Sequence, residues 1–192
     1  VIIDDVNLVP AGVLVLLYPK GGEVCVLLNK RTDRVEHHKG EISFPGGAQD
    51  PGDATILDTA LRETHEEMGV DPADVDIICR LDQTSTRTGF AITPFVGAIP
   101  SAYKFDVSGI EVAEVLEVPI STLLDPAHRQ EEMGTVDNVQ PRQYTYAYGE
   151  HIIWGATAKM LTQFDTILLI STIFFGSSFA NIKIAKPTYL LD

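Results

Sequence analysis

Two short apolar runs joined by a glycine-bearing turn open the regular part of the chain. They occupy residues 11–18 and 23–28, and the turn between them reads Pro19-Lys-Gly-Gly22. Short apolar runs bounded by turn residues are typical of strands, so this segment predicts a β-hairpin with a four-residue turn. Residues 32–47, which follow, are polar and contain glycines, and we expect them to form a loop.

The apolar spacing next changes to that of a helix. The helix is expected to begin near Thr55, with Asp53 or Thr55 as its N-cap, and to stop at Gly69, a residue suited to a left-handed C-cap. Apolar positions recur along one side of it and predict a buried stripe, made of Ile56, Leu57, Ala60, Leu61 and Met68.

Strands and helices are mixed over the rest of the chain. Apolar or alternating runs predict strands at residues 75–81, 91–99, 112–118 and 144–148, and a short helix at 120–124. A C-terminal amphipathic helix is predicted from six apolar positions, which are Ile152, Ile153, Ala156, Met160, Leu161 and Phe164. Elements in this order predict an α/β protein in which a sheet lies between helices.

A nine-residue apolar run, residues 167–175, lies near the C-terminus. It is too short to span a bilayer, so we expect no membrane association. A buried strand or a contact between the two copies of a homodimer is predicted instead.

Composition narrows the class of protein. With 192 residues, of which 45% are hydrophobic and 21% charged, the chain is most simply one domain with a substantial core. The formal net charge of −13 argues against nucleic-acid binding, because no basic stripe is available for a phosphate backbone. An acidic protein that acts on an anionic substrate must neutralise the repulsion locally, and a divalent metal with a few basic side chains would do so.

The cysteines and the N-terminus bear on the compartment. Cys25 and Cys79 lie in apolar, strand-like segments without metal-ligand spacing, and we expect them to be reduced core residues. The first residues show no basic stretch followed by an apolar run and a cleavage site. A cytoplasmic location is therefore expected.

Four charged residues within six positions carry the strongest chemical signal, and they are Arg62, Glu63, Glu66 and Glu67. On a helix the three carboxylates share one side, where like charges repel one another. The arrangement makes sense if a cation lies over them, and Mg²⁺ prefers oxygen ligands that it shares with substrate phosphates. On glutamate content alone, a solvated helix face remains the alternative interpretation.

The residues around these acids resemble the Nudix box, which runs Gly, five residues, Glu, seven residues, and then Arg-Glu-apolar-x-Glu-Glu-x-Gly-apolar. The second half of that motif is matched by Arg62, Glu63, Glu66, Glu67, Gly69 and Val70. Thr64 stands where the motif has an apolar residue. The spacing from Gly47 to Arg62 is one residue longer than in the motif, so its leading Glu has no counterpart, and Asp53 is the nearest acid.

A second signature upstream resembles that of the coenzyme A pyrophosphatase-like branch of the Nudix superfamily. Over residues 27–47 the chain matches this signature without gaps at Arg31, His38, Gly40 and residues 44–47. The chemically close replacements in the same segment are Asn29, Thr32 and Val35. Together the two signatures cover residues 27–70.

The resemblance implies the Nudix fold, a mixed β-sheet sandwiched between helices (α/β/α). It implies one Nudix hydrolase domain over residues 1–192, with a core at about 6–164 and an atypical apolar tail at 165–192. The implied enzyme is a pyrophosphohydrolase that uses Mg²⁺ or Mn²⁺ and takes a small nucleoside diphosphate derivative as its substrate.

The branch implies that coenzyme A or its thioesters are cleaved to 3′,5′-ADP and 4′-phosphopantetheine or its acyl derivative. Hydrolysis of ADP-ribose, NADH or another nucleoside diphosphate derivative is the alternative, since it needs the helix but not the upstream signature. A non-catalytic Nudix-fold binding module would be expected to have lost helix acids, and all three are present.

Roles follow for the acids and for Arg62. Glu63 and Glu67 are predicted metal ligands, because carboxylates at i and i+4 reach one point in space, and Glu66 either completes the site or binds a second metal. The general base is expected either on this helix, at Glu66, or in a later loop, which offers Glu111 and Glu114. For Glu111 a surface role is an equal alternative. Arg62 is predicted to hold the glycine-rich turn at residues 44–53, called the Gly-rich loop below, by charge-assisted hydrogen bonds.

Substrate binding is assigned to basic residues outside the helix, namely Arg31, His38 and Arg87. Arg31, Lys30 and Arg34 are candidates to meet the 3′-phosphate of the ADP moiety, because a guanidinium matches phosphate oxygens bidentately. His38 is a candidate phosphate ligand or, equally, a structural hydrogen-bonding residue.

Overall fold

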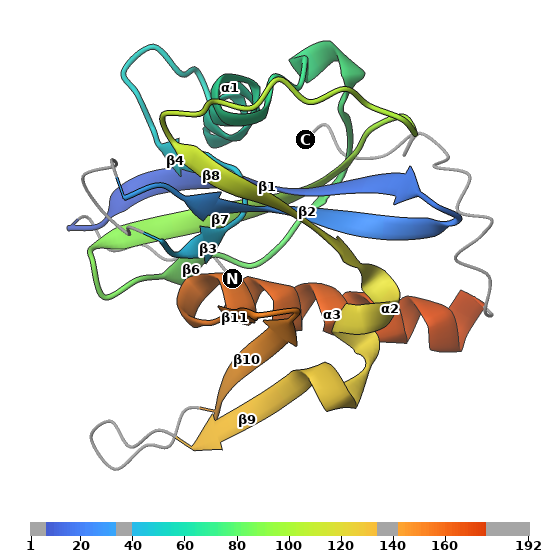
Figure 1. The fold of residues 1–192 in the computed structure, drawn as a ribbon. Helices are drawn as coiled ribbons and strands as arrows, with labels where there is room; N and C mark the ends of the chain where they lie inside the picture. The colour runs from blue at the N-terminus through green and yellow to red at the C-terminus, as the bar shows by residue number, and fades with distance from the viewer. Residues whose placement is uncertain (1–6, 34–39, 134–141, 176–192) are drawn as a thin grey trace.

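The computed structural model describes residues 7–33, 40–133 and 142–175, which form two sheets and three α-helices (Figure 1). Single-turn 3₁₀ helices cover Pro72–Asp74 and Pro126–His128. The strands are β1 (Val9–Lys20), β2 (Glu23–Arg31), β3 (Ile42–Ser43), β4 (Gly46–Ala48), β5 (Asp76–Arg80), β6 (Thr84–Ser85), β7 (Phe90–Ala98), β8 (Val112–Pro119), β9 (Arg129–Met133), β10 (Arg142–Tyr148) and β11 (His151–Ile153). The α-helices are α1 (Ile56–Met68), α2 (Ile120–Leu124) and α3 (Gly155–Phe175).

The predicted fold class, a mixed sheet between helices, is confirmed. In the larger sheet β1 pairs in parallel with β7 and antiparallel with β2, and β8 pairs with the other edge of β2. α1 covers one face of this sheet, and α3 covers the other (Figure 1). A smaller antiparallel sheet of β9, β10 and β11 packs beside α3.

The predicted hairpin is present, but its turn is shorter than expected. Lys20 pairs with Glu23, so the turn consists of Gly21 and Gly22, and both have positive φ. Two consecutive residues with positive φ are what a two-residue hairpin turn requires, and glycine adopts them without steric cost.

Away from this turn, β1 and β2 take other partners. β4 pairs with β1 at residues 11–13, and β3 pairs with β2 at residues 29–30. The segment expected to be a loop at 32–47 therefore contributes two short strands to the sheet. This pairing brings the Gly-rich turn against α1, with which β4 is in contact.

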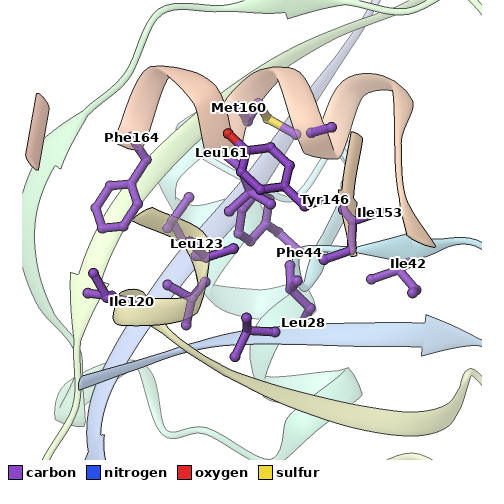
Figure 2. Packing of buried hydrophobic residues seen from close by; sticks show 14 of the residues in the cluster. Leu28, Ile42, Phe44, Ile120, Leu123, Tyr146, Ile153, Met160, Leu161 and Phe164 are labelled. Atoms are coloured by element: carbon purple, nitrogen blue, oxygen red, sulfur yellow. The ribbon is translucent and has the colours of Figure 1, made fainter. Parts of the chain in front are cut away.

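Alternation along β1 and β2 divides the core into two layers. Val13, Val15, Val26 and Leu28 face α3, and the residues between them, such as Leu14 and Leu27, belong to the layer under α1. Both faces are buried, which explains why these strands read as continuous apolar runs. Figure 2 shows the α3 layer, where Leu28 of β2 and Phe44, which lies between β3 and β4, pack in one cluster with residues that include Tyr146, Leu161 and Phe164.

The ends of α1 follow from local chemistry. Thr55 is the N-cap and forms a capping box with Asp58, while Gly69 is the C-cap with φ of 68°. Both ends agree with the prediction, and of the two cap candidates the structure selects Thr55. Asp53 instead contacts Arg62, as described below.

The C-terminal region differs from the prediction. Ile152 and Ile153, expected in a helix, lie in β11 and pair with β10, and α3 begins only at Gly155, which has φ of 66°. The run at 167–175 continues α3 as a helix, so the expectation of a buried strand is wrong, while the homodimer contact stays a prediction. Within the described ranges no helix is both long and apolar enough to cross a membrane.

Candidate active site

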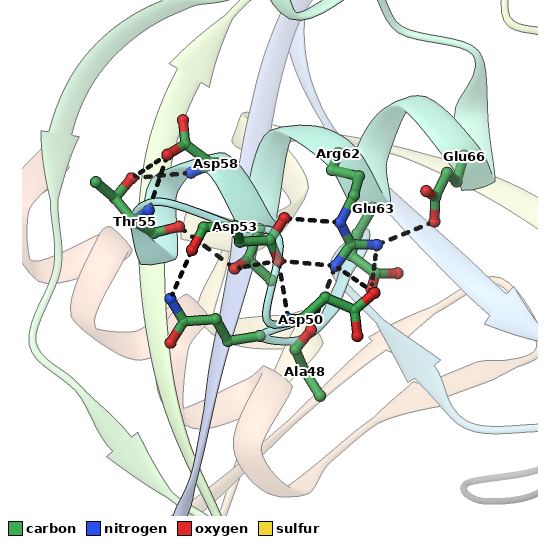
Figure 3. A network of polar contacts seen from close by, with 10 residues as sticks. Ala48, Asp50, Asp53, Thr55, Asp58, Arg62, Glu63 and Glu66 are labelled. Atoms are coloured by element: carbon green, nitrogen blue, oxygen red, sulfur yellow. Dashed lines mark hydrogen bonds and ion pairs between the residues drawn. The ribbon is translucent and has the colours of Figure 1, made fainter.

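Arg62 ties the Gly-rich loop to α1. Its guanidinium makes two hydrogen bonds to the carboxylate of Asp53, at 2.9 and 3.0 Å, and a longer one to the carbonyl of Ala48 (Figure 3). Asp53 also accepts hydrogen bonds from the backbone of Asp50 and from Thr59. The guanidinium holds the pKa of Asp53 well below its usual range, so this carboxylate is charged.

Arg62 also faces two of the predicted metal ligands. Its Nη1 lies 2.9 Å from Oε1 of Glu63 and 3.1 Å from Oε2 of Glu66 (Figure 3). The arginine thus partly neutralises the acids of the helix from the side of the loop. Glu66 keeps about half of its side chain exposed, whereas the Glu63 side chain is 18% exposed.

The carboxyl group of Glu63 lies directly against Gly47 of β4. A Cβ atom there would lie 2.5–2.8 Å from the carboxyl group of Glu63, closer than real contacts allow. The missing side chain leaves room for this carboxyl group beside the loop backbone. Burial raises the pKa of Glu63, and Arg62 opposes that rise.

Glu67 is the most deeply buried of the helix acids, with 3% of the residue exposed. Its Oε2 accepts hydrogen bonds from Nδ2 of Asn29 at 2.8 Å and from the backbone N–H of Gly46 at 3.2 Å. Its Oε1 lies 3.4 Å from Nη1 of Arg31. Burial raises the pKa of Glu67 to about 8, although Arg31 and the Gly46 N–H act in the opposite direction.

The two loop acids proposed as general bases are separated by the structure. Glu111 lies close enough that its charge contributes to the raised pKa of both Glu63 and Glu67. Glu114 instead forms a 3.2 Å contact with His151 and borders a hollow of about 790 Å³ beside β8 and the β10–β11 turn. Only Glu111 is therefore placed with the helix acids.

The donor set fits a hard divalent cation. Burial is the main cause of the raised pKa values of Glu63 and Glu67, and the charges of neighbouring acids, Glu111 among them, raise both values further, while Arg62 and Arg31 oppose the rise. Carboxylate oxygens are the ligands that Mg²⁺ and Mn²⁺ prefer. As the side chains of the described residues stand, no group of three or more His, Cys, Asp or Glu is arranged so that it could hold a metal ion. Cation binding would therefore replace contacts that the arginines make with these carboxylates.

The three residues predicted to bind substrate differ in where they lie relative to the site. Arg31 lies at the site and contacts Glu67. Arg87 lies in the exposed turn between β6 and β7, where its side chain makes no hydrogen bond or ion pair with any described residue. His38, like Arg34, lies outside the described residues.

Two residues of the site were assigned no role there from sequence. Asn29 was noted only as a replacement within the upstream signature, and Asp53 as a cap candidate. A signal for Asn29 exists, because residues 25, 27, 29 and 31 alternate along β2 and the first two face α1. For Asp53 no local pattern indicates the contact with Arg62, which depends on the course of the loop.

Comparisons with known proteins agree with this geometry. The NUDIX domain family profile matches residues 8–115. The uncharacterized Nudix hydrolase NudL of Photorhabdus laumondii is 35% identical over 138 residues, which cover 72% of this chain and 74% of the relative. A protein of the same description from an Enterobacter species is 37% identical over 143 residues, covering 72% of each chain. Among solved structures, the NUDIX domain of Shewanella oneidensis NrtR complexed with ADP ribose superposes with a TM-score of 0.53 at 17% identity, over 84% of this chain and 88% of that one.

The fold and the acidic helix against a glycine loop are those of a Nudix-type protein. The profile match and the NudL relatives show that the chain belongs to the Nudix hydrolase family. The predicted enzyme class, a Nudix pyrophosphohydrolase, is thereby confirmed, and enzymes of this family generally use divalent metal ions.

Proposed function

We propose that the protein hydrolyses the diphosphate linkage of coenzyme A or its thioesters, with Mg²⁺ or Mn²⁺, to 3′,5′-ADP and 4′-phosphopantetheine or its acyl derivative. One observation carries the proposal: the segment with the coenzyme A-type signature meets a proposed metal ligand of the Nudix helix through several of its residues. Asn29, Arg31 and Gly46 of that segment all contact Glu67. A basic residue of the signature thus lies beside the acids that would hold the metal.

Each acid has a task in this proposal. Glu63 and Glu67, with Glu66, would hold the cation, which polarises phosphoryl oxygens and lowers the pKa of coordinated water. Glu111, placed beside them, would accept the proton of the water whose oxygen attacks phosphorus as the bridging P–O bond breaks. Arg62 would keep the loop against the helix through Asp53.

Arg31 is the residue proposed to bind the 3′-phosphate of coenzyme A. Its Nη1 contact with Glu67 is long at 3.4 Å, its Nε has no hydrogen-bond partner within the described residues, and 24% of its side chain is exposed. A guanidinium with unused donors at the rim of an acidic site is suited to a phosphate oxygen.

A substrate panel with Mg²⁺ tests the proposal. Coenzyme A should be cleaved faster than dephospho-coenzyme A, ADP-ribose or NADH at equal concentrations. One charged contact in a partly desolvated site supports about 1–3 kcal/mol of discrimination, or about 5- to 150-fold, between coenzyme A and its dephospho form. Arg31→Ala should bring the ratio of the hydrolysis rate of coenzyme A to that of dephospho-coenzyme A closer to one. The ratio is the informative quantity, because loss of Arg31 also alters the surroundings of Glu67.

Lys30→Ala is the matched control. Lys30 is next to Arg31 but follows Leu28 in the strand alternation and is expected on the α3 side of the sheet. This variant removes one nearby positive charge and should leave the ratio unchanged. If ADP-ribose or NADH turns over far faster than coenzyme A, the substrate assignment is wrong, and metal-dependent cleavage of a different nucleoside diphosphate derivative replaces it.

A further inference from the structure

Asn29 is a buried polar residue on a strand face that is otherwise apolar near it. Cys25 and Leu27 precede it on the same side of β2 and pack in the core layer under α1. Asn29 continues this row with 1% of the residue exposed, and its amide reaches Glu67. An apolar side chain would fill this position without bringing a polar group into the core.

The amide of Asn29 is only half satisfied. Its Nδ2 donates to Oε2 of Glu67 at 2.8 Å, whereas its Oδ1 is buried and has no hydrogen-bond partner among the described residues. A buried acceptor without a partner is unfavourable, so the contribution of Asn29 to stability alone does not explain its place. The orientation of the amide follows from Glu67, which accepts hydrogen bonds when ionised.

The two carboxylate oxygens of Glu67 have different hydrogen-bond donors around them. Oε2 receives two hydrogen bonds, at 2.8 Å from Asn29 and at 3.2 Å from the N–H of Gly46, whereas Oε1 has only the 3.4 Å contact with Arg31. Charge-assisted hydrogen bonds are usually about 2.7–2.9 Å long, so the contact at Oε1 is weak. Oε1 is therefore the oxygen that is available to another cation.

We propose that Asn29 is a positioning residue for cation binding: its amide fixes Oε2 of Glu67 so that Oε1 is presented to a divalent ion. This inference rests on the proposed function, since it requires Glu67 to be a metal ligand. It assigns Asn29 no contact with substrate.

The test measures Mn²⁺ binding in the absence of substrate. Binding is detected as the loss of the electron paramagnetic resonance signal of free Mn²⁺. Asn29→Leu keeps the approximate shape of the side chain and removes its hydrogen bond. Groups that orient metal ligands typically contribute about 10- to 100-fold to affinity, so the Kd for Mn²⁺ should rise by that factor. The Mg²⁺ concentration that half-activates hydrolysis should rise by a similar factor, which a purely structural role of Asn29 would not cause.

Thr64→Val is the matched control. Thr64 is as deeply buried as Asn29, and its hydroxyl donates to the carbonyl of Ala60 within α1 at 2.6 Å. The variant therefore removes one buried hydrogen bond from α1, the helix that carries Glu67, and leaves the hydrogen bonds of Glu67 in place. Its Mn²⁺ affinity should equal that of the wild type.

The outcomes separate this inference from the proposed function. If Glu67→Gln loses Mn²⁺ but Asn29→Leu binds it as the wild type does, the role of Asn29 is refuted and the metal site stands. If the wild type and Glu67→Gln bind Mn²⁺ alike, the metal assignment fails and this inference fails with it. Should Asn29→Leu not fold, Asn29→Ala removes the same hydrogen bond without adding a branched side chain, and the same loss is expected.

Discussion

At the scale of single residues, burial decides the character of the site. Glu67 is removed from water, which disfavours its charged form, yet three donors from Asn29, Arg31 and Gly46 surround it. A buried carboxylate contributes little to stability even when it is paired. We therefore interpret this arrangement as one that serves chemistry.

A second buried acid lies far from the site in sequence and in the fold. Asp165 of α3 has 1% of the residue exposed and accepts a hydrogen bond from the hydroxyl of Tyr146 at 2.7 Å. Its other oxygen, Oδ1, has no partner within the described residues. Burial raises the pKa of Asp165 to about 6, while Tyr146 and Arg129 oppose the rise.

The raised pKa of Asp165 predicts a pH-dependent loss of stability. The native state retains the proton to a higher pH than the unfolded state, so the free energy of unfolding falls as the pH rises from about 4 to about 6. Below this window both states are protonated and nothing is lost. A shift of about two pKa units corresponds to about 3 kcal/mol at neutral pH, as an upper bound.

Asp165→Asn should remove this loss. We expect the variant to be more stable than the wild type at neutral pH and equal to it near pH 4. Urea unfolding at a series of pH values measures the difference. Asp76→Asn, at an exposed position of β5, is the control for the loss of one formal charge. A difference between Asp165→Asn and wild type that is constant over the window would contradict the account.

At the scale of elements, local patterns predicted α1 well. Thr55 with Asp58 and the left-handed Gly69 are signals that need no tertiary contact, and the structure uses both. The C-terminal helix was predicted less well, because Ile152 and Ile153 fit a helical spacing and yet pair with β10. Pairing between strands is a long-range property, and a window of neighbouring residues does not contain it.

The same limit explains why the sequence did not predict strand β4. Residues 46–48 read as a turn because of their glycines, but they pair with β1, and this pairing sets the distance between the loop and α1. The Nudix resemblance relates Gly47 to Arg62 only through their spacing in the sequence. It did not indicate that Gly47 in particular lies against the carboxyl group of Glu63.

Gly47→Ala tests this close approach. The new methyl group would displace the Glu63 carboxyl group, and a misplacement of about 1 Å can reduce turnover by about 100-fold. Stability should change little, because the displaced group is the end of a flexible side chain. Turnover and thermal unfolding of the purified variant measure both effects.

Gly52→Ala is the control for Gly47→Ala. Gly52 belongs to the same loop, but a Cβ atom there would have no neighbour within 4 Å. Its turnover should match the wild type. If Gly47→Ala is as active as Gly52→Ala, the position of Glu63 against the loop does not matter for catalysis.

At the scale of the whole molecule, the site collects segments that are distant in sequence. Asn29 and Arg31 come from β2, Gly46 from β4, Glu63 and Glu67 from α1, and Glu111 from the residue before β8. The two sequence signatures predicted that the first three segments matter, whereas the contacts between them required the fold. The homodimer and the role of the residues beyond Phe175 stay predictions.

The charge of the molecule sharpens the need for a cation. With a formal net charge of −13, the protein repels an anionic diphosphate, and its site adds three glutamates on one helix face. Arg31 and Arg62 are engaged with these acids and neutralise them only in part. A divalent ion bound by the same carboxylates would remove the remaining repulsion where the substrate must lie.

The most direct measurement compares the Mg²⁺-dependent hydrolysis rates of wild type, Glu63→Gln and Glu67→Gln with coenzyme A as substrate. Each substitution preserves shape and removes one carboxylate, so the account predicts cooperative unfolding in both variants. Turnover should fall by at least about 100-fold, since a bound metal supplies several kcal/mol of transition-state stabilisation. Wild-type rates in both folded variants, at the same Mg²⁺ concentration, would contradict the claim that these two glutamates hold the catalytic metal.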